Sequence, residues 1–161
     1  MAPPPSDRFV HEVIDTPGVG PAGWSAALAL GLSTQVPRHE SIAVPGRVPR
    51  NPGSIRIVSR SASTKRRDEK LRPVEVALLE VLRDWNTLVE VTPGAAAEHI
   101  ADLVDDGTIR LDRTVRASAA GPARVRERLR RLLNALGRPG EAAPVRPARS
   151  DPVRSDIVLA D

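Results

Sequence analysis

The sequence predicts an α+β fold in which a small mixed or antiparallel sheet is packed by helices and the C-terminal half is helical. Two short runs rich in β-branched residues, 40–45 and 54–60, flank a loop rich in proline and glycine, which is typical of strands in one sheet. Apolar residues recur at helical spacing after Pro73 and again after Pro122. With 161 residues, 40% of them hydrophobic, the chain suits one domain with a modest core.

The N-terminal part is predicted to hold a disordered end, a first strand and an alanine-rich helix. Residues 1–8 contain three consecutive prolines and little to bury, so we expect them to be disordered. Residues 9–14 predict a strand. The uncharged run that follows predicts a buried helix over 21–32, and Gly31 suits a left-handed helix end.

In the second of the two strands, 54–60, successive side chains are assigned to alternate faces. Ile55 and Ile57 fall on one face of this strand and Arg56 and Val58 on the other. We therefore expect the strand to be covered on one side only.

The first helix of the second half begins at Pro73, a residue that suits the first helical turn. Its apolar residues lie at i, i+4, i+7, i+8 and i+11 and form one face, so that the helix is expected to be a core element. These residues are Val74, Leu78, Val81, Leu82 and Trp85.

Two more helices are predicted further along. Thr92 and Pro93 form an N-cap and first-turn pair for a helix that stops at Gly107. A last helix is predicted over 122–136. We assign 9–137 to one domain and expect the segment 138–161, rich in proline, arginine and alanine, to be a flexible tail.

Composition excludes several classes of protein. The chain has 24 basic and 20 acidic residues, and the basic residues are arginines except for Lys65 and Lys70. Only 2% of the residues are aromatic, too few for the base-stacking platforms of single-strand binders, and the absence of cysteine excludes disulfide and thiolate chemistry. The sequence has no apolar run of membrane-spanning length and no signal peptide pattern, so we expect a cytoplasmic protein that does not bind membranes.

Residues suited to catalysis or metal binding are scattered. His11, His39 and His99 lack the spacing of a metal site, and the glycines form no phosphate-binding loop, so we predict neither a metal nor a cofactor. Ser33 follows a helix, whereas a nucleophile elbow joins a strand to a helix, and its hydroxyl is expected to cap a turn. The acidic pair Asp105 and Asp106 at a helix end is expected to be solvated, with a metal or partner contact as the alternative. An enzyme is the least supported class, so we predict neither catalytic residues nor a small-molecule substrate.

Two basic clusters are candidates for partner binding. The first, between a strand and a helix, is expected to be a solvated loop or a contact to phosphate or acidic protein; it contains Arg60, Lys65, Arg66, Arg67, Lys70 and Arg72. The second lies on the last helix, where Arg124, Arg128 and Arg131 share one face beside the apolar stripe. Guanidinium groups pair with carboxylates and with phosphates, so this face is expected either to bind an acidic protein surface or DNA, or to be an ordinary solvated face.

Several segments carry a resemblance to a known family. The run "AALALGLSTQVP" resembles the start of the effector domain in AbiEi-type antitoxins, and "LRPVEVALLEVLRDW" and "ARVRERLRRLLNALG" follow in the order in which that domain shows similar segments. The resemblance covers roughly residues 13–137. Members of this family usually carry an N-terminal winged helix-turn-helix, for which this sequence offers no segment.

The resemblance implies an antitoxin of the type IV class whose partner is a nucleotidyltransferase-like toxin. It implies neutralisation of that toxin without a separate DNA-reading domain, so that DNA binding is expected to be weak. Arg124, Arg128 and Arg131, with Arg60, Arg66 and Arg67 as a secondary contact, are then the expected interface. An apolar interface on the alanine-rich helix or on residues 156–160 is the alternative site. The alternative function is a DNA-binding regulator that uses 93–106 and 122–136 as an atypical helix-turn-helix.

Overall fold

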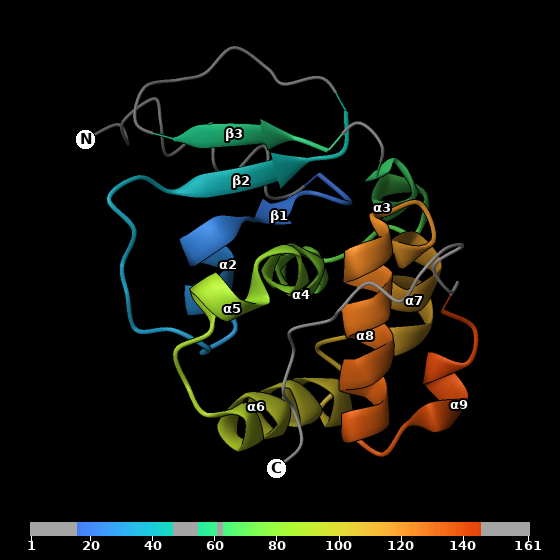
Figure 1. Cartoon of the computed structure of the whole chain (residues 1–161). Helices are drawn as coiled ribbons and strands as arrows, with labels where there is room; N and C mark the ends of the chain where they lie inside the picture. The colour runs from blue at the N-terminus through green and yellow to red at the C-terminus, as the bar shows by residue number, and fades with distance from the viewer. Residues whose placement is uncertain (1–15, 47–54, 61–62, 146–161) are drawn as a thin grey trace.

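A three-stranded mixed sheet lies on one side of the molecule, and helices pack beneath and beside it (Figure 1). The computed structural model describes residues 16–46, 55–60 and 63–145. Its architecture confirms the predicted α+β class, with the strands in the N-terminal half and the helices concentrated in the C-terminal half. The predicted disordered end and the predicted strand at 9–14 lie outside the described residues.

The sheet has the strand order β1-β2-β3. β1 (Gly20–Pro21) pairs antiparallel with β2 (Ser41–Val44), and β2 pairs parallel with β3 (Arg56–Ser59). The two strands predicted from β-branched runs are therefore present and adjacent. Their parallel pairing puts Ile42 beside Ile57 and makes the sheet mixed.

The two faces of the sheet contribute to different clusters of buried side chains. Val19, Ile42 and Ile55 form a small cluster, against which Ile57 packs. Ala43 belongs instead to the main core. Successive residues of a strand point to opposite faces, so the alternation in 54–60 is confirmed: Ile55 and Ile57 lie on the same side.

The alanine-rich helix α2 (Gly23–Ala29) is shorter than the predicted 21–32 because a backbone motif closes it. The N–H of Leu32 donates to the carbonyl of Ala27 at 2.9 Å, and the N–H of Gly31 donates to that of Leu28 at 3.1 Å. Gly31 has φ +72°, so this is the Schellman arrangement, which needs a left-handed residue after the helix.

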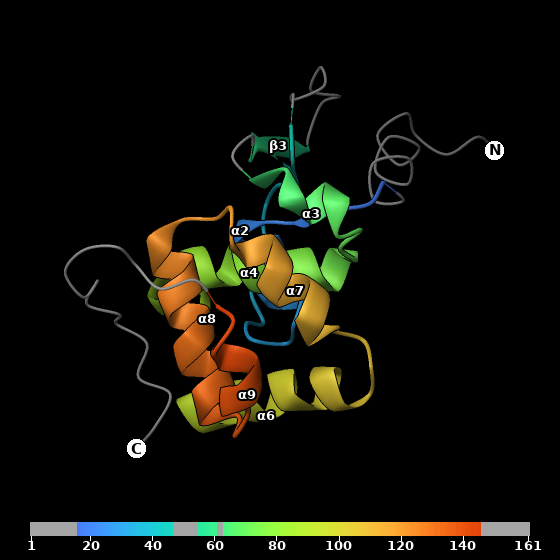
Figure 2. The ribbon, with the colours of Figure 1, turned by 90° about the vertical axis from the view of Figure 1, so that its right-hand side faces the viewer.

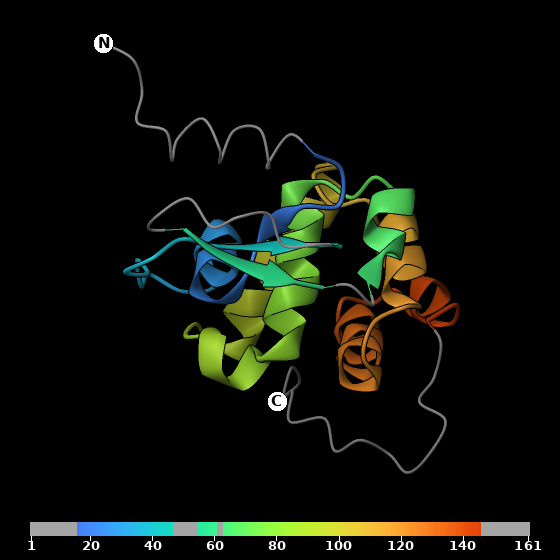
Figure 3. The same ribbon diagram turned by 90° about the horizontal axis from the view of Figure 1, so that it is seen from above.

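Helix α4 (Pro73–Arg83) is the centre of the fold, and the strands run across it when seen from above (Figure 3). Every residue over 75–82 is buried, because the helix contacts β1, α2 and α8 on different sides. Leu78 and Leu82 are fully buried, and Trp85 continues the same face in the short helix α5 (Trp85–Leu88). The predicted core face is confirmed.

The remaining helices are α3 (Lys65–Asp68), α6 (Pro93–Asp105), α7 (Leu111–Ser118), α8 (Ala123–Ala135) and α9 (Pro139–Ala142). Of these, α3 comes before α4 and the others follow α5 in the chain (Figure 2). Thr92 caps α6 as predicted, since its side chain accepts the N–H of Ala95 at 3.2 Å. Gly107 follows α6, which confirms the predicted stop, and Gly137 follows α8; both have positive φ.

Helix α7 was not predicted, because charged residues interrupt its short apolar pattern. Its buried residues Leu111, Thr114, Val115 and Ser118 are nevertheless spaced i, i+3, i+4 and i+7. That spacing is the signal from which the helix could have been found.

The prediction of a flexible tail from Arg138 onward is wrong for residues 138–145. Helix α9 lies there, and Ala142 and Val145 are buried in the main core against α7 and α8. Two apolar side chains are too few to form a recognisable helical pattern in the sequence, but their burial in the main core is enough to order this short segment. Residues 146–161 lie outside the described part. Within the described ranges no helix has the length and apolar character needed to cross a membrane.

Candidate partner-binding site

The basic segment between β3 and α4 holds the fold together, and the prediction of a solvated loop is wrong for its central residue. Arg66 lies in α3 and is only 2% exposed. Its Nη1 donates to Oε2 of Glu80 at 2.8 Å, and Arg60 donates to the same carboxylate through Nε and Nη2. Glu80 points from α4 and is 2% exposed, so one buried carboxylate holds two arginines.

The charge state of Glu80 follows from this arrangement. Burial raises the pKa of the Glu80 carboxyl, but the hydrogen bonds from Arg60 and Arg66 and their charges more than offset this, so that its pKa lies below the usual range. Burial lowers the pKa of Arg66, while Glu80 raises it. Both groups are charged at neutral pH, because the lowered pKa keeps the Glu80 carboxyl ionised and an arginine keeps its proton in proteins.

Arg67 is likewise engaged with the fold. Its Nη2 donates to the carbonyl of Pro45 at 2.8 Å and so ties α3 to the end of β2. Of the three arginines expected as a secondary contact, Arg66 is therefore unavailable to a partner, and Arg60 and Arg67 are bonded to neighbouring segments.

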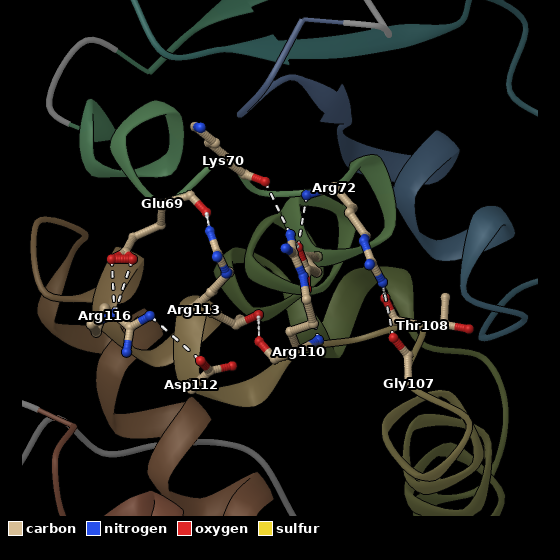
Figure 4. Close-up of polar contacts among 11 residues, drawn as sticks. Glu69, Lys70, Arg72, Gly107, Thr108, Arg110, Asp112, Arg113 and Arg116 are labelled. Atoms are coloured by element: carbon tan, nitrogen blue, oxygen red, sulfur yellow. Dashed lines mark hydrogen bonds and ion pairs between the residues drawn. The ribbon is translucent and has the colours of Figure 1, made fainter.

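A second arginine network joins the start of α4 to the start of α7 (Figure 4). Glu75 is completely buried and accepts the backbone N–H groups of Arg72 and Arg110, each at 2.7 Å, as well as the Arg110 guanidinium. Burial raises the pKa of Glu75, and these hydrogen bonds offset it and bring the pKa below the usual range.

The network extends outward from Glu75. Arg110 donates to the carbonyl of Lys70 at 3.0 Å, Arg113 to that of Glu69 at 3.1 Å, and Arg116 holds the Glu69 carboxylate at 2.8 Å (Figure 4). This set of residues was not predicted from the sequence. Its members come from segments about 35 to 47 positions apart, so no local spacing marks them.

The three arginines of α8 that were predicted to form an interface differ in their exposure. Arg124 and Arg131 are exposed, but Arg128 is only 9% exposed, and its Nη1 donates to the carbonyls of Leu82 and Arg83 at 2.8 Å. Leu82 and Arg83 are the last residues of α4, so their carbonyl groups accept no hydrogen bond from within that helix. Arg128 therefore caps α4 from a neighbouring helix, and its prediction as a partner contact is wrong.

The order of the helices also bears on DNA binding. A helix-turn-helix needs two consecutive helices joined by a short turn. Helix α7 lies between α6 and α8, so the pair predicted at 93–106 and 122–136 is not consecutive.

Other candidate residues have structural partners. Ser33 Oγ accepts the N–H of Gln35 at 3.1 Å, as expected for a turn cap, and donates to Glu90 at 2.8 Å. The hydrogen bonds from Ser33 and Thr34 lower the pKa of Glu90. Of the acidic pair, Asp105 pairs with Arg138 at 2.9 Å and Asp106 accepts the N–H of Thr108. Over the described residues, no histidine or carboxylate cluster suits a metal ion.

Comparison with known proteins finds one similar fold. The structure is similar to the crystal structure of RV2827C protein from Mycobacterium tuberculosis, with a TM-score of 0.55 and 22% sequence identity over 92% of this chain. The chain spans 59% of that structure's length. No family model and no curated protein matches the sequence. At this identity the likeness concerns the fold alone.

Proposed function

We propose that this chain is the effector domain of a cytoplasmic antitoxin that neutralises a nucleotidyltransferase-like toxin by binding it. The sequence support is the ordered resemblance to AbiEi-type antitoxins over residues 13–137. The structural observation that supports a binding role is that some arginines are paired inside the fold while others are exposed on α8. The buried carboxylates, Glu75 and Glu80, are occupied by arginines of the fold, whereas α8 exposes arginines on its outer side.

The interface that we propose uses Arg124 and Arg131. They are seven residues apart on α8 and therefore lie on nearly the same side of the helix, two turns from each other. A nucleotidyltransferase that holds its nucleotide through metal ions needs acidic residues at its active site. Arginines facing such carboxylates would form charge-assisted hydrogen bonds and would steer the two proteins together.

The test is co-expression with a nucleotidyltransferase-like protein encoded by a gene adjacent to that of this chain, scored as rescue of growth. The double substitution Arg124→Glu and Arg131→Glu, with Arg128 retained, is expected to weaken toxin binding and abolish rescue while the circular dichroism spectrum stays unchanged. The matched control is Arg38→Glu with Arg56→Glu, which makes the same change of charge at two exposed positions near the sheet. Full rescue by the α8 double variant would show that the interface lies elsewhere.

The second candidate function is a DNA-binding transcriptional regulator that represses its own toxin–antitoxin operon. The observation that favours it is that α7 and the arginine-rich α8 are consecutive and joined by a short turn. For an antitoxin effector domain we expect weak promoter binding that falls steeply with salt and shows little sequence preference. Nanomolar, sequence-selective binding at physiological salt would favour the regulator instead.

A further inference from the structure

A small basic cavity lies where the end of β3, the end of α4 and the start of α8 meet. Its volume is about 330 Å³, and it is lined by Ser59, Arg60, Ser63, Arg83 and residues 120–122. In Figures 1 and 2 the chain enters α8 at the end of that helix nearest the sheet. The function proposed above uses none of these lining residues.

Positive charge at the cavity exceeds the negative charge that balances it. Burial lowers the pKa of Arg83, and the positive charges of Arg60, Arg66 and Arg124 lower it further, with Glu80 as the only opposing carboxylate. Glu80 already holds Arg60 and Arg66. Arg83 itself forms no ion pair with any residue that the structure describes.

A guanidinium that is partly desolvated among other guanidinium groups lacks the counter-charge that such groups normally acquire. An anion in the cavity would supply it. The volume suits a tetrahedral oxyanion or the phosphate end of a small molecule.

Two kinds of hydrogen-bond donor lie in the cavity or directly next to it: the Ser63 hydroxyl lines it, and the first amides of α8 follow the lining residue Pro122. Ser63 is only 3% exposed, and its hydroxyl has no hydrogen-bond partner among the described residues. Pro122, which lines the cavity, is the N-cap of α8 and provides no side-chain acceptor. Among the described residues, the next two N–H groups of this thirteen-residue helix, those of Ala123 and Arg124, are uncapped. Uncapped amides at a helix N-terminus, with the helix dipole behind them, favour an anion.

We propose that this cavity is a binding site for a phosphate-class oxyanion. Arg83 and the Ser63 hydroxyl are its side-chain ligands, the α8 N-terminal amides are its backbone ligands, and Arg60 and Arg124 contribute charge. Arginine suits this role because its planar group donates two parallel hydrogen bonds to a phosphate. Free phosphate and the phosphate of a mononucleotide share this chemistry.

The proposal is tested by titrating the isotope-labelled full chain with potassium phosphate, against potassium chloride at matched ionic strength, and recording amide chemical shifts. The amides of Ser63, Ala123 and Arg124 are expected to shift together in one saturable process. A parallel titration with adenosine monophosphate distinguishes the sources. Tighter binding of the nucleotide at the same amides assigns the site to a nucleotide phosphate, and equal or tighter binding of phosphate assigns it to the free ion.

Substitutions decide whether the site is specific. Arg83→Gln removes the central ligand without breaking an ion pair, and Ser63→Ala removes the hydroxyl. Each is expected to weaken binding, and Arg83→Gln should do so roughly tenfold or more, as loss of a charged hydrogen bond implies. Arg56→Gln, which removes the same charge from an exposed position on β3, is the matched control and should leave the affinity unchanged.

Several results would overturn the proposal. One is equal affinity of the parent and the Arg83→Gln chain for phosphate, and another is the same shifts with chloride alone. A third is a set of shifts spread over the exposed arginines instead of the cavity. If duplex DNA shifted these amides and phosphate did not, the cavity would be part of a DNA surface. Because no toxin takes part, failure here leaves the proposed antitoxin function untouched.

Discussion

Substituting Glu80 by glutamine tests how much the buried arginine pair contributes to stability. The carboxylate accepts hydrogen bonds from Arg60 at 2.8 and 3.1 Å and from Arg66 at 2.8 Å. The amide keeps one acceptor oxygen but turns a donor toward the other guanidinium. Arg66, almost fully buried, then lacks its counter-charge.

The expected loss of unfolding free energy is large. Removing one partner of a buried ion pair costs about 3–5 kcal/mol, a substantial part of the roughly 5–15 kcal/mol by which domains are stable. Glu127→Gln is the matched control. Glu127 lies 3.6 Å from Arg130 and 3.9 Å from Arg131 at the surface, so its loss should cost less than about 1 kcal/mol.

Urea unfolding followed by tryptophan fluorescence measures both variants, since Trp85 lies in the core next to α4. A Glu80→Gln chain within 1 kcal/mol of the parent would refute the reasoning. It would mean that the desolvation cost of the three charged groups already cancels their attraction, or that water reaches Arg66.

Three further predictions concern acid stability and packing. Glu75 and Glu80 have lowered pKa values in the folded chain, so they contribute stability above the unfolded carboxyl pKa of about 4.3. This stability is lost as the pH falls through their folded pKa values. Urea unfolding at a series of pH values should show the decline, and a weaker decline for Glu80→Gln. Leu78→Ala should cost about 2–5 kcal/mol, since the side chain is fully buried in α4, and an unchanged melting curve would contradict the core assignment. Gly18→Ala should lower the free energy of unfolding by about 1–3 kcal/mol more than Gly31→Ala. Both positions have positive φ, but only at Gly18 would a Cβ meet backbone atoms of α3, at 2.7–2.9 Å. Equal midpoints of the two variants in thermal unfolding would contradict this prediction.

The sequence alone was sufficient where the determining signal is local. Helices α4, α6 and α8 could be predicted because their apolar spacing lies within each helix, and the Thr92 cap of α6 and the glycines after α6 and α8 lie directly beside them. The faces of β3 followed from alternation for the same reason. These patterns depend on the geometry of a single helix or strand, and that geometry is the same in every fold.

Tertiary structure decided which charges serve the fold and which face outward. Arg124 and Arg128 belong to one helix and have the same chemistry, yet one is exposed and the other caps α4 from 45 and 46 positions away. The two buried carboxylates look like ordinary surface residues of a helix in the sequence, because burial of a charge depends on a partner brought from elsewhere in the chain. The parallel pairing of β2 with β3 was likewise undetermined by the strand patterns, since alternation fixes faces and leaves strand direction open. Residue type gives the charge, and only the packing of distant segments gives its partner.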